Sequence, residues 1–307
     1  MDRRFYEGIV AQALREDIGH GDITTSLCVP RDVKGRAVVV AKEDCVVAGI
    51  FVAEEAFLQC DPDCSFPMAL NEGARANSGD VVMEIQGSLQ AILQAERTAL
   101  NFLQRLCGIA TLTRHFVEKI GGLPCRLVDT RKTTPCLRVL EKYAVRAGGG
   151  FNHRYGLSDG ILIKDNHIAA CGSIKEALSK VRASCPHTLK IEIEVSTLDE
   201  LKEAIDAGAD AVLLDNMDVK TLTEAVAMAR GLKPGLLLEA SGGVCLENVR
   251  DVAGTGVDIV SAGALTHSAR AVDLSLRVIR FAFADGHCLT PSSSASSRGS
   301  ESSSTCN

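Results

Sequence analysis

Apolar residues in the second half of the chain form short continuous runs, separated by stretches with helical spacing. Such uninterrupted runs are typical of strands buried on both faces of a parallel sheet. The runs lie at residues 126–129, 161–164, 189–195, 211–215, 236–239 and 257–261. The helical stretches fall near residues 135–147, 173–183, 198–207, 218–230, 245–253 and 270–283. The repeat predicts an α/β fold with helices outside a parallel sheet. Six units fall short of the eight in a closed barrel, but the pattern is closer to a barrel than to an open sheet.

The first half of the chain follows a different pattern. Residues 1–16 have the spacing of an amphipathic helix with Phe5 on its apolar face, and residues 18–26 form a turn-rich connector. Between residues 34 and 90, short β-like runs are broken by Gly, Asn and Asp, and one helix lies near residues 52–59. This half is therefore predicted to be a small α+β domain.

A long helix is predicted from about residue 89 to residue 120. Arg97 and Arg105 fall outside its apolar stripe, and from the pattern alone both belong to a solvated face. The stripe itself consists of Leu100, Leu103, Leu106 and Cys107.

Composition narrows the class of protein. The 307 residues are 46% hydrophobic, enough for a large core and two domains, and the net charge of −6 argues against general nucleic-acid or membrane-surface binding. The twelve cysteines lack the spacing of a metal site; the nearest pair, Cys60 and Cys64, stands alone. We therefore expect reduced thiols, and, because no secretory or membrane-spanning run is present, a cytoplasmic location. Residues 286–307 are Ser-rich and are predicted to be a disordered tail.

Positive charge is concentrated between residues 129 and 167, which are net positive by three in an acidic chain. Such a cluster favours a compact anion as ligand, because an extended polyanion would be repelled by the rest of the protein. His153 and Arg154 follow a glycine run in this segment and are candidate anion ligands, although a lone histidine is more often structural. The cations of the segment are Arg131, Lys132, Arg138, Lys142, Arg146, Arg154 and Lys164.

Polar residues end most of the predicted strands. Barrel enzymes place their working groups at the carboxyl ends of strands, and a buried strand has no structural need for a charge there. Any one of these residues alone could be a helix cap or an ion-pair partner. It is their occurrence together at the strand ends that indicates an active site. The residues are Asp129, Lys164, Glu192 or Glu194, Asp215, Glu239 and Ser261.

Two glycine-rich loops follow the last two of these strands, Ser241-Gly242-Gly243 and Ser261-Ala262-Gly263. Their backbone N–H groups predict a phosphate site. Glu194 and Asp215 could bind Mg²⁺ beside that phosphate, stabilise a cationic intermediate, or only neutralise nearby cations. Together with the arginines, these groups describe a ligand with one phosphorylated part and one carboxylate-rich part.

The motifs as a set carry a family resemblance. DTRKTTP (129–135), KYAVRAGGGFNHR (142–154), LIKDNH (162–167), LLDNM (213–217), EASGG (239–243) and SAGALTHS (261–268) closely resemble quinolinate phosphoribosyltransferases. EDIGHGDITT (16–25) and ERTALNFLQRLCGIAT (96–111) match the same family in the first half. The resemblance covers nearly all of the chain except the Ser-rich tail.

The resemblance implies a pentosyltransferase that joins quinolinate to phosphoribosyl pyrophosphate with Mg²⁺. The products are nicotinate mononucleotide, pyrophosphate and CO₂, at the entry to NAD biosynthesis. It also implies an N-terminal α/β sandwich domain (1–110) and an open, incomplete α/β barrel (111–269). A C-terminal helix at about 270–285 would return to the first domain.

Site residues are implied by the same motifs. Arg131, His153, Arg154 and Lys164 would contact the quinolinate carboxylates beside Thr130, and Lys132 would reach quinolinate or pyrophosphate. Glu194 and Asp215 would serve the metal, directly or through substrate and water, and the ribose; with Lys132 they are the candidate catalytic groups. The loops from Ser241 to Gly243 and from Ser261 through Ala262 to Gly263 would hold the 5′-phosphate.

Arg97 would enter the site of a neighbouring subunit in a homodimer or hexamer, which replaces its assignment to a solvated face. Two departures from the family pattern remain. Cys136 stands where the family usually has Gly, and Cys107 where Ser is common.

Two other functions stay open. One is a phosphoribosyltransferase for a mono-acid such as nicotinate, against which the number of cations argues. The other is a non-catalytic phosphosugar-binding protein, against which the retained Glu194, Asp215 and Lys132 argue.

Overall fold

The computed structural model describes residues 1–282 and 288–289. In the first half of that region the elements are η1 (Arg3–Phe5), α1 (Glu7–Ile18), α2 (Ile23–Cys28), β1 (Lys34–Ala41), β2 (Cys45–Val46), α3 (Ile50–Cys60), β3 (Ser65–Ala69), β4 (Arg75–Ala76), β5 (Val81–Ser88) and α4 (Leu89–Ile120). The second half contains β6 (Arg126–Val128), α5 (Arg138–Ala147), β7 (Ile161–Ile163), α6 (Asp165–Cys171), α7 (Ile174–Ser184), β8 (Ile191–Val195), α8 (Leu198–Asp206), β9 (Ala211–Asp215), α9 (Val219–Leu232), β10 (Leu237–Ser241), α10 (Val249–Gly254), β11 (Ile259–Ser261), α11 (Ala264–His267), β12 (Leu274–Ala282) and β13 (Cys288–Leu289).

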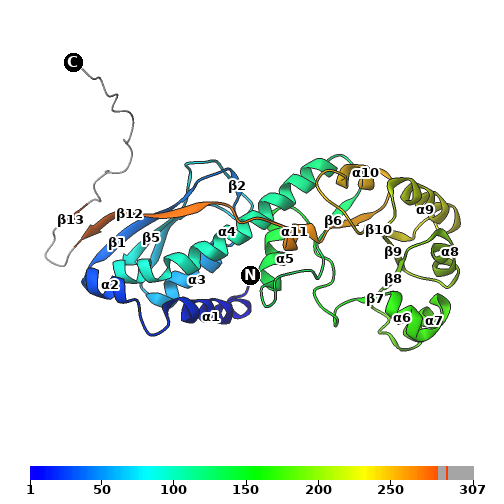
Figure 1. The fold of residues 1–307 in the computed structure, drawn as a ribbon, viewed down its shortest axis with the longest axis horizontal. Coiled ribbons are helices and arrows are strands. Elements are labelled where there is room, and N and C mark those ends of the chain that lie inside the picture. The colour runs from blue at the N-terminus through cyan, green and yellow to red at the C-terminus, as the bar shows by residue number, and fades with distance from the viewer. Residues whose placement is uncertain (283–287, 290–307) are drawn as a thin grey trace, which may run out of the picture.

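Two main sheets lie toward opposite ends of an elongated molecule (Figure 1). The first is antiparallel, with strand order β13-β12-β1-β5-β3. Helix α4 packs on β1, β5 and β12 and also contacts α1 and α3, so helices cover one face of this sheet. Most of β1 is buried because it is the central strand, paired on both sides. The predicted α+β N-terminal unit is confirmed.

The second sheet is parallel, with strand order β6-β11-β10-β9-β8-β7. Within the described residues, the outer strands β6 and β7 do not pair with each other, so the barrel is open, as expected. Helices α7, α8 and α9 pack against one another along its outside. Because all six strands run in the same direction, their carboxyl ends meet at one edge, where the charged strand-end residues were predicted to gather.

Helix α4 has the bounds that the pattern predicted, and its stripe of Leu100, Leu103, Leu106 and Cys107 is buried. The solvated face predicted for Arg105 is wrong. Its guanidinium Nη2 donates to the buried Glu141 at 2.8 Å, and Nη1 donates to the Ala269 carbonyl at 2.6 Å. Arg105 thus joins α4 to α5 and to the segment after α11.

The helix predicted at about 270–285 is wrong. Residues 274–282 instead form β12, antiparallel to β1, with Ala41 opposite Leu274 and Lys34 opposite Ala282. Leu274, Leu276 and Val278 pack against the core at a spacing of two, which is the period of a strand and not of a helix. The return of this segment to the N-terminal unit, however, occurs as expected.

Smaller differences concern the ends of the chain. Phe5 was placed on an apolar face but is 62% exposed in η1, and the connector at 18–26 contains most of α2. Most of the predicted tail, 286–287 and 290–307, lies outside the described residues. Cys288 and Leu289 pair with β12, so disorder was wrong for these two. No helix among the described residues is long and apolar enough to cross a membrane.

Candidate active site

A cavity of about 620 Å³ opens at the carboxyl ends of the parallel strands. It brings together residues from β6 through α11 that are far apart in sequence. Its lining includes every predicted site residue except Arg97 and Ala262: Thr130, Arg131, Lys132, His153, Arg154, Lys164, Glu194, Asp215, Ser241, Gly242, Gly243, Ser261 and Gly263. Ala262 is buried, and its N–H donates to the Val128 carbonyl at 3.0 Å.

Cations form one wall of the cavity. Arg131 and Lys132 follow β6, and the Lys132 carbonyl accepts a hydrogen bond from Thr266 Oγ1 at 2.8 Å. Arg154 Nη1 donates to the Gly160 carbonyl at 2.9 Å, while its buried Nε has no partner. Burial and the positive charge of Arg131 lower the pKa of Arg154. Two guanidinium groups that repel each other beside an open cavity form a site for an anion.

The loop that carries His153 and Arg154 is fixed by Asp129, which is fully buried. The Asp129 carboxylate accepts hydrogen bonds from Lys142 Nζ, from Asn152 Nδ2 at 2.5 Å and from the His153 backbone N–H at 2.9 Å. Burial raises the pKa of Asp129, although Lys142 acts in the opposite direction. Asp129 had been grouped with the working residues at the strand ends, but it does not line the cavity. Its position makes it a positioning residue.

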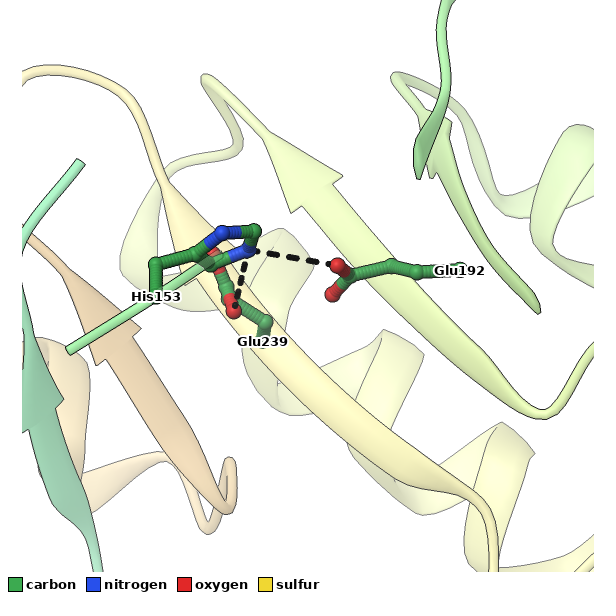
Figure 2. Close-up of side chains that lie close together, drawn as sticks. All are labelled: His153, Glu192 and Glu239. Carbon is green, nitrogen blue, oxygen red and sulfur yellow. Dashed lines mark ion pairs between the residues drawn. The ribbon is translucent and has the colours of Figure 1, made fainter. Parts of the chain in front are cut away.

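His153 lies between two glutamates from neighbouring parts of the sheet (Figure 2). Its Nε2 is 3.2 Å from Glu192 Oε2 on β8 and 3.6 Å from Glu239 Oε2 on β10. The other ring nitrogen, Nδ1, accepts the Arg154 backbone N–H at 2.8 Å. Both ring nitrogens of His153 therefore have partners within the protein. The Nε2–H could donate a hydrogen bond to a substrate carboxylate only if it broke its contact with Glu192 or Glu239.

The surroundings of His153 and Glu239 raise the pKa values of both side chains. Burial lowers the pKa of His153, but the hydrogen bond to Glu192 and the charges of both glutamates outweigh it, so the pKa rises. Burial and the charge of Glu192 raise the pKa of Glu239 to about 7, against the opposing effect of His153. The three ligand atoms are close enough to hold a metal ion. A metal at Nε2 would move the ring proton to Nδ1 and break the Arg154 backbone bond.

Glu192 and Glu194 alternate with buried residues along β8, so both point to the same side of the sheet. The strand pattern alone left open which of the two belongs to the site, whereas the family motifs implied Glu194. Glu194 lines the cavity and pairs with Lys164 Nζ, whereas Glu192 reaches His153. Asp215, on the adjacent strand β9, accepts a hydrogen bond from Asn216 Nδ2 at 2.7 Å.

The glycine-rich loops also line the cavity. Gly242 has φ +93°, and a Cβ there would meet Asn216 Oδ1 and lie 2.8 Å from the Asn216 backbone nitrogen. A Cβ on Gly263 would lie 3.0 Å from the His267 ring and from Lys132 Cδ. Only glycine therefore fits between these groups without displacement, and the backbone of both loops faces the cavity.

The two departures from the family pattern have different consequences. Cys136 has φ +65°, a left-handed conformation that favours glycine. Cys107 is buried, accepts the Ala48 N–H at 3.3 Å and donates to the Ala48 carbonyl at 3.5 Å, as a serine hydroxyl would. The first departure introduces backbone strain just before α5, and the second preserves the hydrogen bonding.

Several lining residues were not predicted as site residues: Leu162, Leu213, Asn216, Glu239, Val244, Ala264 and His267. Asn216 and His267 lie inside the motifs LLDNM and SAGALTHS, so the sequence carried their signal. Glu239 was recognised at a strand end but received no role. Arg97 is exposed on α4 and is absent from the lining of this cavity.

An open α/β barrel whose mouth combines a cationic wall, paired carboxylates and two glycine-rich loops defines an enzyme class that binds a phosphorylated group beside a second anion. The chain belongs to the quinolinate phosphoribosyltransferase family. The family model for the N-terminal domain matches residues 22–107, and the model for the C-terminal domain matches residues 109–277.

Individual relatives agree with this assignment. The chain is 45% identical over 263 residues to the "Probable nicotinate-nucleotide pyrophosphorylase [carboxylating]" of Bacillus subtilis, covering 86% of this chain and 90% of the relative. It is 39% identical to "Quinolinate phosphoribosyltransferase [decarboxylating] 1b" of Nicotiana tabacum, covering 89% and 82%. The crystal structure of NadC from Streptococcus pyogenes is similar, with a TM-score of 0.86, 40% identity, and coverage of 92% and 98%.

Proposed function

We propose that this protein transfers the phosphoribosyl group of phosphoribosyl pyrophosphate to quinolinate with decarboxylation. The products would be nicotinate mononucleotide, pyrophosphate and CO₂, as a step of NAD biosynthesis. The main support is one arrangement: two like-charged guanidinium groups, Arg131 and Arg154, face the same cavity as the glycine-rich loops. The names of the relatives describe the same conversion, in either direction.

Quinolinate fits the cationic wall because it carries two adjacent carboxylates. A guanidinium group binds a carboxylate through two parallel hydrogen bonds, and Arg154 has an unpaired buried Nε to offer. Lys132 belongs to this wall and its side chain lies against Gly263, so it can reach either quinolinate or the pyrophosphate. Lys164 can bind a quinolinate carboxylate once Glu194, its ion-pair partner, interacts with phosphoribosyl pyrophosphate instead.

The reaction at ribose C1 requires stabilisation of positive charge. As pyrophosphate leaves, C1 takes on oxocarbenium character, and the carboxylates of Glu194 and Asp215 stabilise that charge. The quinolinate nitrogen, held by the cationic wall, then attacks C1. The positive pyridinium nitrogen afterwards accepts the electrons that remain when the adjacent carboxylate leaves as CO₂.

Glu194 and Asp215 suit a magnesium ion that is held through substrate oxygens and water. Glu194 and Asp215 supply the oxygen ligands that Mg²⁺ prefers, but Glu194 is paired with Lys164 and Asp215 accepts from Asn216. Coordination through substrate oxygens and water would not require Mg²⁺ itself to break either pair. Bound Mg²⁺ would supply positive charge to the departing pyrophosphate. Calorimetry of phosphoribosyl pyrophosphate binding with and without Mg²⁺ tests this without an activity measurement.

We further propose that Arg97 completes the site of a neighbouring subunit in a homodimer or hexamer. Its exposure on α4, away from its own cavity, supports this. Mixing Arg97→Gln with Arg131→Gln tests it, because each mixed dimer would contain one intact site. Random pairing would then restore about a quarter of wild-type activity. No recovery on confirmed exchange of subunits would contradict the shared site. The cytoplasmic location stays a prediction.

The decisive experiment supplies quinolinate, phosphoribosyl pyrophosphate and Mg²⁺. Mass spectrometry should detect nicotinate mononucleotide, and CO₂ release distinguishes quinolinate from nicotinate as substrate. Arg154→Gln should lower kcat/KM by a factor of roughly 10², the loss expected for a charged hydrogen bond. The exposed Lys175→Met on α7 is the matched control and should keep wild-type activity. Binding of both substrates with no product would indicate a phosphosugar-binding protein instead.

A further inference from the structure

Among the described residues that line the cavity, Glu239 is the one buried carboxyl group. The proposed mechanism gives it no role. It lies on β10, is 3% exposed, and faces His153 (Figure 2). Its Oε2 is near the His153 ring, and its Oε1 is buried beside the Ser261 hydroxyl without a hydrogen bond of good geometry. Burial with so few hydrogen bonds is costly for a charged carboxylate and favours the protonated form.

The proposed reaction has a matching requirement. Loss of CO₂ breaks the bond between the pyridine C2 and its carboxylate, and the electron pair stays on C2 beside the positive nitrogen. Nicotinate mononucleotide carries a hydrogen at C2, so a proton must reach that carbon. The cavity must therefore contain an acid close to the quinolinate ring.

Other groups around the cavity are less suited to this task. An arginine does not release a proton near neutral pH. Lys164 is paired with Glu194, and the Nε2–H of His153 is directed at Glu192. His267 lies at Gly263 on the phosphate side, with Nδ1 2.7 Å from Ser268 Oγ.

We propose that Glu239 is the acid that delivers the proton to C2 of the pyridine ring when CO₂ leaves. This inference rests on the proposed function. The carboxylic O–H bond breaks, a C2–H bond forms with the electron pair left by CO₂, and Glu239 becomes a carboxylate. That carboxylate regains a proton from solvent before the next turnover. His153 and Glu192 are the positioning groups that hold the acid against the cavity.

The charges that face Glu239 suit an acid operating near neutral pH. Glu192 on β8 adds negative charge, whereas His153 and the more distant Lys164 add positive charge, and Ser261 on β11 lies beside it. Burial and Glu192 prevail, which gives a pKa of about 7. A carboxyl group kept neutral by its surroundings can serve as a proton donor where an ordinary glutamate would be ionised.

The test separates sugar transfer from decarboxylation in a single turnover. Pyrophosphate and ¹⁴CO₂ are followed for wild type, Glu239→Gln, Glu239→Asp and, as an outer-surface control on α9, Glu224→Gln. In Glu239→Gln we expect pyrophosphate release at a near wild-type rate, whereas nicotinate mononucleotide formation slows by roughly 10²-fold. Phosphoribosyl-quinolinate should then accumulate. Glu239→Asp should recover part of the rate, and Glu224→Gln should resemble wild type.

Dependence on pH provides a second test. The acid must be protonated, so the wild-type rate of product formation should fall as the pH rises through about 7. Glu192→Gln removes a negative charge and should shift this fall to lower pH, and Glu239→Gln should abolish it. The proposal is overturned if Glu239→Gln forms product at the wild-type rate or slows both steps equally. An unshifted pH profile in Glu192→Gln also overturns it, even if Glu239→Gln does not fold. Failure of the wild-type protein to release pyrophosphate from these substrates would instead contradict the proposed function.

Discussion

Replacing Lys142 with Met tests the scaffold beneath the active site. Lys142 is 4% exposed and Asp129 fully buried, and their ion pair joins α5 to the end of β6. Lys142 Nζ also donates to the His153 carbonyl at 3.1 Å. Removing one member of a buried pair leaves the other charge uncompensated, which costs about 3–5 kcal/mol. We expect Lys142→Met to lose that much of its free energy of unfolding at pH 7.

The sign of the pH dependence follows from Asp129. Burial already raises its pKa, and loss of the Lys142 charge, which acts to lower it, will raise it further. At pH 7 the variant must either bury a carboxylate without its cation or protonate it at a cost. As the pH falls toward 5, protonation becomes easier, so the deficit relative to wild type should shrink. Urea unfolding at both pH values, at one protein concentration, measures this difference.

A double-mutant cycle with Asp129→Asn isolates the pair. Each single variant leaves one buried charge, whereas the double variant leaves none, so the double loss should be smaller than the sum by about 1–3 kcal/mol. Lys175→Met, an exposed lysine on α7, is the control and should stay within about 0.5 kcal/mol of wild type. The reasoning would be refuted if Lys142→Met lost less than about 1 kcal/mol of the free energy of unfolding at pH 7 and this loss did not change at lower pH.

Four further outcomes are expected. Cys136→Gly should raise the free energy of unfolding by about 1 kcal/mol in thermal or urea melts, because it relieves the left-handed strain at φ +65°. Gly242→Ala should weaken binding of phosphoribosyl pyrophosphate roughly 10-fold or more in calorimetry, because its Cβ collides with Asn216, a steric cost of about 1–3 kcal/mol. Gly243→Ala, at φ +61° with no atom near its Cβ, is the matched control and should show only the smaller strain in stability. Folding raises the pKa of Glu239 from 4.5 to about 7, so the free energy of unfolding of the wild-type protein should fall between pH 5 and pH 8. Glu239→Gln lacks this titration, and its free energy of unfolding relative to wild type should therefore be higher at pH 8 than at pH 5 by on the order of 3 kcal/mol.

Sequence patterns predicted the fold where local spacing and tertiary packing agree. The apolar stripe of α4 and the continuous parallel strands are of this kind, since burial alone dictates them. Residues 274–282 are different, because the alternation of Leu274, Leu276 and Val278 is a strand pattern that the prediction of a helix overlooked. The partner of this strand, the edge of β1, lies more than 200 residues earlier in the chain, and the alternation alone does not identify it.

The same distinction applies to the candidate site. Charged strand ends and glycine-rich loops predicted the lining well, because parallel strands bring their carboxyl ends together whatever the details. The roles of Asp129 and Glu239 could not be read in this way. Both are acids near strand ends, yet Asp129 points to Lys142 beneath the loop and Glu239 to His153 at the cavity. Side-chain direction and depth, rather than position in the sequence, decide between scaffold and chemistry.

Depth also explains how an acidic protein keeps a cationic cavity. The most buried acids are matched inside the protein: Asp129 by Lys142, Glu141 by Arg105 and Glu55 by Arg3. Nearer the mouth, Lys164 is matched by Glu194, but the described residues offer no carboxylate within ion-pairing distance of Arg131 or Arg154. The two guanidinium groups are therefore the charges that only a ligand can neutralise. Because their mutual repulsion raises the energy of the empty site, a ligand with two adjacent carboxylates gains more from binding there than a mono-acid does. The preference for a dicarboxylate thus follows from what the protein leaves unpaired.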